Sequence, residues 1–251
     1  SDVVEGSLLS ETEVGFRTVI TNYGSIGDPN SPSTGRPSCE YPAYSGNNYL
    51  YDGGLWVGGE VNEQRPVTTH FFNPHMEWLP CISSGGTRPE KAFTILNDTN
   101  RVEVCFDDLA SHSESSHVPL GIKVYADYQL SPSIENPETE DSEIAPWGTL
   151  SYSIINTGLN GYLTGIYVGL WLDFDVSSAD NSEPHIDDLV DFDEDLKLSY
   201  MYDGDHPGSS EDDIGENGQS EGYVGIALVS SPNNSVASHA WWNWESDPMD
   251  L

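Results

Sequence analysis

The sequence predicts an all-β fold, an antiparallel β-sandwich of jelly-roll-like form with long acidic loops. Short runs rich in β-branched and aromatic residues recur along the 251-residue chain, separated by Gly, Pro and Asn. No window shows the apolar repeat of a long amphipathic helix. An aromatic content of 11% also argues against disorder, because it supplies enough bulky side chains for a packed core.

The expected strands follow one another in chain order. The first covers residues 15–22, a β-branched run that ends in the turn formed by Asn22, Tyr23 and Gly24. Later strands with the same pattern are expected at 49–51, 54–58, 93–96, 102–106, 121–130, 148–156, 162–173, 196–202 and 223–230. Residues 166–172 are apolar throughout, which predicts a central strand covered on both faces.

The polar connections are long, and none of them is a clear linker between domains. They cover residues 27–37, 131–146, 176–184 and 204–220, and the last two flank or interrupt the most acidic part of the chain. We therefore expect a single domain over residues 1–251, with an N-terminal strand or arm at about residues 1–22. The first residues lack both an initiator Met and an apolar signal core, as expected for a processed, secreted chain.

The charge balance excludes several partners. Against 42 Asp and Glu there are only 8 Lys and Arg, a formal net charge of −34. Nucleic acid and anionic membrane surfaces are poor partners for such a chain. No apolar run reaches the length of about 18 residues that a spanning helix needs, so no membrane insertion is expected. Self-repulsion on this scale implies either bound divalent cations or a saline environment.

The distribution of the acids favours bound calcium over a diffuse adaptation to salt. Of the 42 carboxylates, 15 lie between Asp173 and Asp213. Calcium takes about six to eight oxygen ligands, which closely spaced Asp on strand ends and loops provide. The spacing does not match an EF-hand, and a solvated acidic loop without metal stays an alternative. The candidate ligands are Asp173, Asp175, Asp187, Asp188, Asp191, Asp193, Asp203 and Asp205.

The three cysteines, Cys39, Cys81 and Cys105, allow one intramolecular disulfide and leave one thiol over. In an oxidising compartment the odd cysteine is free to pair between subunits. Three reduced, buried cysteines are the alternative. The seven histidines are expected to be exposed loop residues, because no metalloprotease motif brings them together.

Two parts of the chain carry a resemblance to a known type of domain. The first contains TNYGSIG at 21–27 and YLYDGGLWVGG at 49–59, and the second contains YVGLWLDFD at 167–175 and LKLSYMYDGD at 196–205. They resemble an uncharacterised β domain of large secreted surface proteins of Bacteroidota and related phyla, often exported with a C-terminal sorting domain. The resemblance implies secretion and a surface or matrix role, and it implies no activity.

Three functions stay open on the sequence. The first is an extracellular, calcium-binding structural protein that assembles with copies of itself into a filament, tubule or surface layer, and the absence of catalytic motifs favours it. The second is a calcium-stabilised carbohydrate-binding module that uses Trp241, Trp242 and Trp244. The third is a glycoside hydrolase, which needs a pair of carboxylates at a sugar site. We expect a protein that is not an enzyme.

Overall fold

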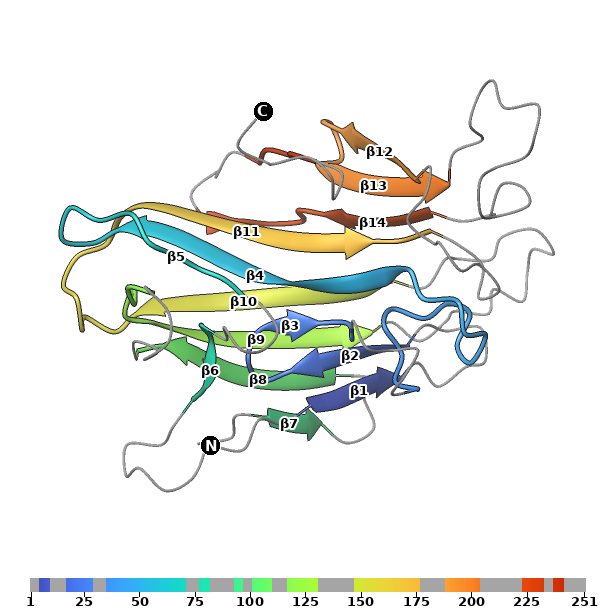
Figure 1. The fold of residues 1–251 in the computed structure, drawn as a ribbon, viewed down its shortest axis with the longest axis horizontal. Helices are drawn as coiled ribbons and strands as arrows, with labels where there is room; N and C mark the ends of the chain where they lie inside the picture. Colours follow the sequence, from blue (N-terminus) through green and yellow to red (C-terminus); the bar gives the residue numbers. More distant parts are fainter. Residues whose placement is uncertain are drawn as a thin grey trace. The chain divides into compact units, whose positions relative to one another are not determined.

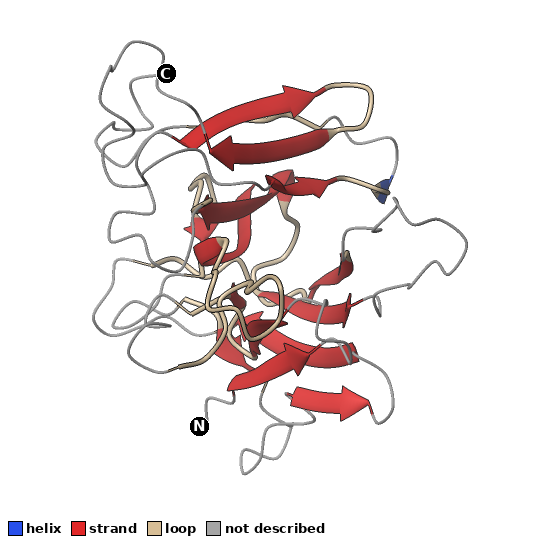
Figure 2. Ribbon diagram, turned by 90° about the vertical axis from the view of Figure 1, so that its right-hand side faces the viewer, coloured by secondary structure: helices blue, strands red, loops and turns tan. Residues whose placement is uncertain are grey.

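A computed structural model describes the chain in residues 5–9, 17–28, 35–70, 77–81, 93–96, 101–109, 117–130, 147–176, 188–203, 223–232 and 237–241. These residues form fourteen strands in antiparallel sheets and no α-helix, which confirms the expected all-β antiparallel sandwich (Figures 1 and 2). None of the described elements is a helix long and apolar enough to cross a membrane.

The chain divides into two compact units, residues 1–173 and residues 174–251. The single domain over residues 1–251 stays a prediction, and no Gly-rich or Pro-rich linker marks the boundary between the two units. The boundary instead falls at the end of one long strand, where the chain passes directly from Asp173 to Phe174. Each unit has sheets of its own and is described by itself.

The first sheet of the first unit contains the strands from the beginning of the chain and one late strand. Its order is β1 (Glu5–Leu9), β2 (Arg17–Thr21), β3 (Ser25–Ile26), β4 (Leu50–Glu60) and β11 (Thr164–Phe174), and β5 (Val67–Thr68) also pairs with β4. The strand expected at residues 15–22 corresponds to β2, and β1 precedes it in the chain. Strand β1 forms a hairpin with β2 of its own chain, with Glu5 opposite Thr21.

The second sheet of this unit is built on three long strands. Its order is β10 (Gly148–Asn156), β9 (Ile122–Leu130), β8 (Arg101–Asp108) and β6 (Leu79–Pro80), and β7 (Phe93–Leu96) also pairs with β8. Burial alternates along β9, where every second residue from Ile122 to Leu130 is buried. This alternation is what a strand covered on one face requires.

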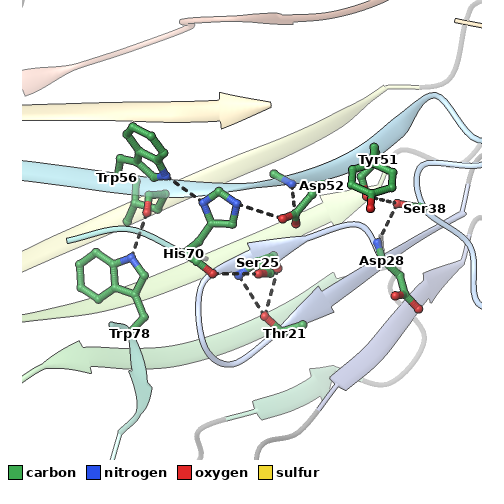
Figure 3. Close-up of polar contacts among 11 residues, drawn as sticks. Thr21, Ser25, Asp28, Ser38, Tyr51, Asp52, Trp56, His70 and Trp78 are labelled. Atoms are coloured by element: carbon green, nitrogen blue, oxygen red, sulfur yellow. Dashed lines mark hydrogen bonds and ion pairs between the residues drawn. The ribbon is translucent and has the colours of Figure 1, made fainter. Parts of the chain in front are cut away.

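The core of the first unit joins the two sheets through Trp78. Its indole lies fully buried just before β6, and Nε1 donates a hydrogen bond to the carbonyl of Leu55 on β4, at 2.9 Å (Figure 3). Its ring meets that of Phe106 on β8 edge-on, with centroids 5.2 Å apart. Gly24, at φ 87°, lies against this indole, and a Cβ added at position 24 would lie 3.0 Å from it. The positive φ and this close neighbour both favour glycine at position 24.

Strand β11 differs from its prediction. Residues 166–172 were expected to form a central strand covered on both faces, and this expectation is wrong. Among the described strands β11 pairs only with β4 and forms the edge of the sheet. Residues 164–169 are all exposed, and the side chain of Tyr167 is 79% exposed. An apolar run means that a strand contains no charged side chains, but it does not determine how many strands pair with it.

The second unit contains one described sheet, β12 (Asp188–Asp193), β13 (Leu198–Asp203) and β14 (Tyr223–Ala227), in that order. A tight turn at residues 194–197 joins β12 to β13. Oδ1 of Asp193 accepts hydrogen bonds from the backbone N–H groups of Asp195 and Leu196, both at 2.9 Å. An Asp that binds the backbone two and three residues ahead stabilises a turn of this kind.

Candidate functional site

Two Asp positions stand opposite each other in the backbone register where β12 begins and β13 ends. Asp188 stands directly opposite Asp203 in the antiparallel register. The backbone N–H of Val176 donates to Oδ2 of Asp188 at 3.2 Å, which brings the preceding Asp175 to the same end of the sheet. This set of Asp175, Asp188 and Asp203 is called the acidic end below.

The other candidate calcium ligands on this sheet lie elsewhere. Asp191 and Asp193 are odd-numbered residues of β12 and project from the opposite face to Asp188, because side chains alternate along a strand. Oδ2 of Asp191 accepts a hydrogen bond from the hydroxyl of Tyr200 at 3.0 Å, and its Oδ1 accepts one from the backbone of Phe192. These two bonds, the backbone bond first, lower the pKa of Asp191.

The predicted calcium ligand set stays a prediction. Asp187 and Asp205, which adjoin the acidic end in sequence, lie outside the described residues, and Asp173 belongs to the first unit. Within the described parts of the chain, no three His, Cys, Asp or Glu side chains lie close enough together to hold a metal ion.

A buried polar cluster that the sequence did not predict surrounds His117. Its Nε2 lies 2.7 Å from Oδ1 of Asp108, and its Nδ1 lies 3.2 Å from Oε1 of Glu77. The imidazole is almost completely buried, so the expectation of an exposed loop histidine is wrong for this residue. The second oxygen of Asp108 accepts hydrogen bonds from the hydroxyl of Thr68 at 2.6 Å and the backbone of Leu120 at 2.7 Å.

The electrostatics of this cluster keep His117 charged. Burial alone would lower the pKa of His117, but the hydrogen bonds to Asp108 and Glu77 outweigh burial and raise the pKa to about 9. Burial acts to raise the pKa of Glu77, yet its bonds to His117 and Thr69 leave that pKa below its usual range. Both ring nitrogens of the imidazolium donate to carboxylates, so His117 has no lone pair for a metal or for general base catalysis.

His70 is also buried, so the expectation of an exposed loop histidine is wrong for it too, and Figure 3 shows it between Trp56 and Asp52. Nε1 of Trp56 donates to Nδ1 of His70 at 2.9 Å, which places the ring proton on Nε2. That nitrogen faces Oδ2 of Asp52 at 3.5 Å, and the ring of Trp171 lies 5.3 Å away. Gly54 is required beside this ring, since an added Cβ would lie 2.3 Å from it. The contacts of His70 therefore join β4, β5 and β11.

The structure describes all three cysteines, but only one of the three candidate ligand-binding tryptophans. Cys81 and Cys105 form a disulfide with Cα atoms 5.4 Å apart, which joins the end of β6 to β8. Cys39 is a free thiol, and burial raises its pKa to about 12. Trp241 is exposed, whereas Trp242 and Trp244 lie outside the described residues.

No protein-family profile, curated protein or solved structure matches the chain.

One buried carboxyl is expected to make stability depend on pH. Burial raises the pKa of Asp107 to about 6, although Lys123, its partner across β8 and β9, acts to lower it. Because the pKa of Asp107 is higher in the folded than in the unfolded protein, its contribution to stability is most favourable below about pH 4 and falls as pH rises through 6. We expect Asp107→Asn to raise the free energy of unfolding by about 1–2 kcal/mol at pH 7 and to have little effect at pH 4.

Urea unfolding at both pH values measures this difference. Asp127→Asn is the matched control, because Asp127 lies on the neighbouring strand and pairs with Arg101 in a half-exposed position. The free energy of unfolding of Asp127→Asn is not expected to rise at pH 7. An equal gain from Asp107→Asn at the two pH values would contradict the assignment to a buried, ionised carboxylate.

Proposed function

We propose that the chain is a secreted, calcium-stabilised structural protein, not an enzyme, that assembles with copies of itself through the edges of its sheets. The observation that carries the proposal is the edge strand β11, with its exposed apolar residues.

An edge strand presents a row of backbone N–H and C=O groups to which another chain can add a strand. Monomeric proteins block long edges with Lys, Pro, bulges or charges directed inward. From Thr164 to Leu172 strand β11 contains no charged residue and no Pro, and Ile166, Tyr167 and Val168 are exposed in sequence. Such a strand is suited to pair with a neighbouring copy.

The first sheet has a second edge strand, so the contact between copies can join two different edges. Along the described strands β1 lies at the opposite edge from β11. A contact between β11 of one copy and β1 of the next uses two different surfaces, and an interface of this type continues into a filament unless the ring closes. The proposed product is therefore a polymer.

Calcium is proposed as the ion that makes this assembly possible. Each copy carries a formal charge of −34, so packing copies together is strongly opposed by repulsion. The acidic end brings three Asp positions to one end of the sheet of the second unit, and carboxylate oxygens are among the ligands that calcium prefers. The Cys81–Cys105 disulfide and the resemblance to secreted surface proteins support an oxidising, extracellular location.

Sedimentation velocity of the purified chain in low salt tests the proposal. In millimolar calcium we expect fast-sedimenting polymer, and excess chelator is expected to return it to a single slow species. If sodium chloride alone drives assembly as well as calcium does, the acids serve as general salt adaptation and calcium has no specific role. A compact monomer under every condition would rule out self-assembly.

One substitution that adds a charge to β11 tests the role of this edge strand. Tyr167→Glu places a carboxylate in the exposed apolar stretch of β11 and is expected to abolish the polymer in calcium, because charged side chains on an edge strand discourage pairing with another chain. Tyr162→Glu makes the same change at a side chain that is 94% exposed and outside any strand. This control is expected to assemble as the unchanged protein does, and loss of assembly in both variants would remove β11 from the mechanism.

The carbohydrate-binding module is the second candidate, and the exposed side chain of Trp241 favours it. If the chain is monomeric and binds immobilised glycans, and if Trp241→Ala removes that binding, this function replaces the structural one.

A further inference from the structure

A cluster of three tyrosines lies on one face of the sheet of the second unit. Tyr200 and Tyr202 are alternate residues of β13, and Tyr223 on β14 stands directly opposite Tyr202. Alternation therefore directs all three side chains to the same side. Their ring centroids lie 5.4 to 6.3 Å apart, and Tyr223 is 74% exposed. These three side chains, with Asp191 beside Tyr200, are called the tyrosine face.

The tyrosine face surrounds an open depression. Gly225 stands opposite Tyr200 on β14 and lines this depression, which has a volume of about 360 Å³. The lining is Leu198, Tyr200, Tyr223, Val224 and Gly225. A Cβ at position 225 would lie 2.7 Å from the carbonyl oxygen of Ser199, so the site requires glycine. A ligand group that enters here meets aromatic and aliphatic surface on its sides.

A carboxylate completes this surface. Asp191 stands opposite Tyr200 on β12 and accepts the hydrogen bond of its hydroxyl. Asp191 is an exposed aspartate, so it carries a negative charge at neutral pH. The negative charge therefore lies at the rim of the aromatic cluster, where a bound cation would meet both the rings and the carboxylate.

The charge of the second unit selects among possible ligands. Residues 174–251 contain 19 Asp and Glu and a single basic residue, Lys197. The resulting negative potential attracts cations and repels acidic ligands. A cation over the face of a tyrosine is stabilised further by the ring quadrupole. A neutral sugar would gain from the rings alone and nothing from the charge.

We propose that the tyrosine face binds a basic peptide segment of a partner protein. A Lys or Arg side chain of that segment lies over the rings of Tyr200 and Tyr223 and pairs with Asp191. Arginine is the better fit, because its planar guanidinium stacks on aromatic rings and also donates two parallel hydrogen bonds to a carboxylate.

Fluorescence anisotropy with a labelled tetra-arginine peptide tests the site, at physiological ionic strength and in chelator, so that no divalent cation competes. Tyr223→Leu keeps an apolar side chain and removes the ring, and we expect it to weaken binding about three- to tenfold. Tyr162→Leu is the matched control, an exposed tyrosine of the first unit, and it is expected to bind as the unchanged protein does. Asp191→Asn, which keeps an acceptor for Tyr200, is also expected to weaken binding.

Two results would overturn the proposal. Equal peptide affinity in Tyr223→Leu, Tyr162→Leu and the unchanged protein would show attraction by overall charge alone. Binding of a neutral cello-oligosaccharide that depends on Tyr223, without binding of the peptide, would make the face a glycan site. Far-UV circular dichroism of each variant, compared with that of the unchanged protein, separates lost binding from lost folding.

Discussion

Replacing Asp108 with alanine is expected to lower the free energy of unfolding by about 4 kcal/mol, because it removes one partner of a buried ion pair. The carboxylate of Asp108 accepts three hydrogen bonds, from His117, Thr68 and Leu120, and its own side chain is completely inaccessible. Without it, the imidazolium loses its nearest counter-charge, and two buried donors lose their acceptor.

Urea unfolding at pH 7 measures this loss, and its pH dependence identifies the cause. The pKa of His117 is about 9 in the folded protein and about 6.5 in an unfolded chain, so its stabilisation is complete below pH 6.5 and is lost as pH rises through 9. Asp108→Ala is expected to flatten this alkaline decline. A cost below about 1 kcal/mol, or an unchanged alkaline decline, would contradict the importance of the His117 pair.

Replacing Trp78 with alanine is expected to cost about 3–5 kcal/mol, since the indole fills the space between the two sheets of the first unit. Trp78→Phe keeps most of this volume and loses the hydrogen bond to Leu55, so a smaller cost of about 1–2 kcal/mol is expected. The two variants together separate the contribution of packing from that of the hydrogen bond.

The measurement is urea unfolding with the disulfide intact. Trp147→Ala serves as control, because Trp147 is exposed, and its effect is expected to stay within about 0.5 kcal/mol. Equal costs for Trp78→Ala and Trp147→Ala would show that the sheets do not pack through Trp78.

Strand positions could be predicted where the local pattern was clear. The strand expected at 148–156 coincides with β10 (Gly148–Asn156), because alternating small and apolar residues are bounded by Gly and Asn. The pairing of β11 could not be predicted, since whether a strand has one neighbour or two depends on the rest of the fold. The same holds for the division into two units, which no local composition marks.

Some features of the candidate site could be predicted from the sequence, and others could not. The alternation of Asp191 and Asp193 along the chain implies a shared face, and the register places both on one side of β12. Which residue stands opposite Asp188 depends on the register of the hairpin, which spacing along the chain does not determine. The burial of His117 depends on Glu77, 40 residues earlier in the chain, so a local reading of a polar loop misses it.

The tyrosine face could not be predicted from spacing along the chain. Tyr200 and Tyr202 have strand spacing, but Tyr223 follows only after about twenty residues, and its partner is set by the pairing of β13 with β14. Composition alone shows that tyrosine is abundant in this chain. Only the register turns three separate residues into one surface.

The free thiol of Cys39 gives the protein an internal reporter of unfolding. Because burial raises the pKa of Cys39 to about 12, the folded protein holds very little thiolate there at pH 8, whereas an ordinary exposed cysteine is ionised in a substantial fraction. Alkylating reagents consume the thiolate, so folded protein reacts slowly and opened protein quickly. Because Cys81 and Cys105 are oxidised, the labelling signal comes from a single known position, and its rate follows the opening of the region around Cys39.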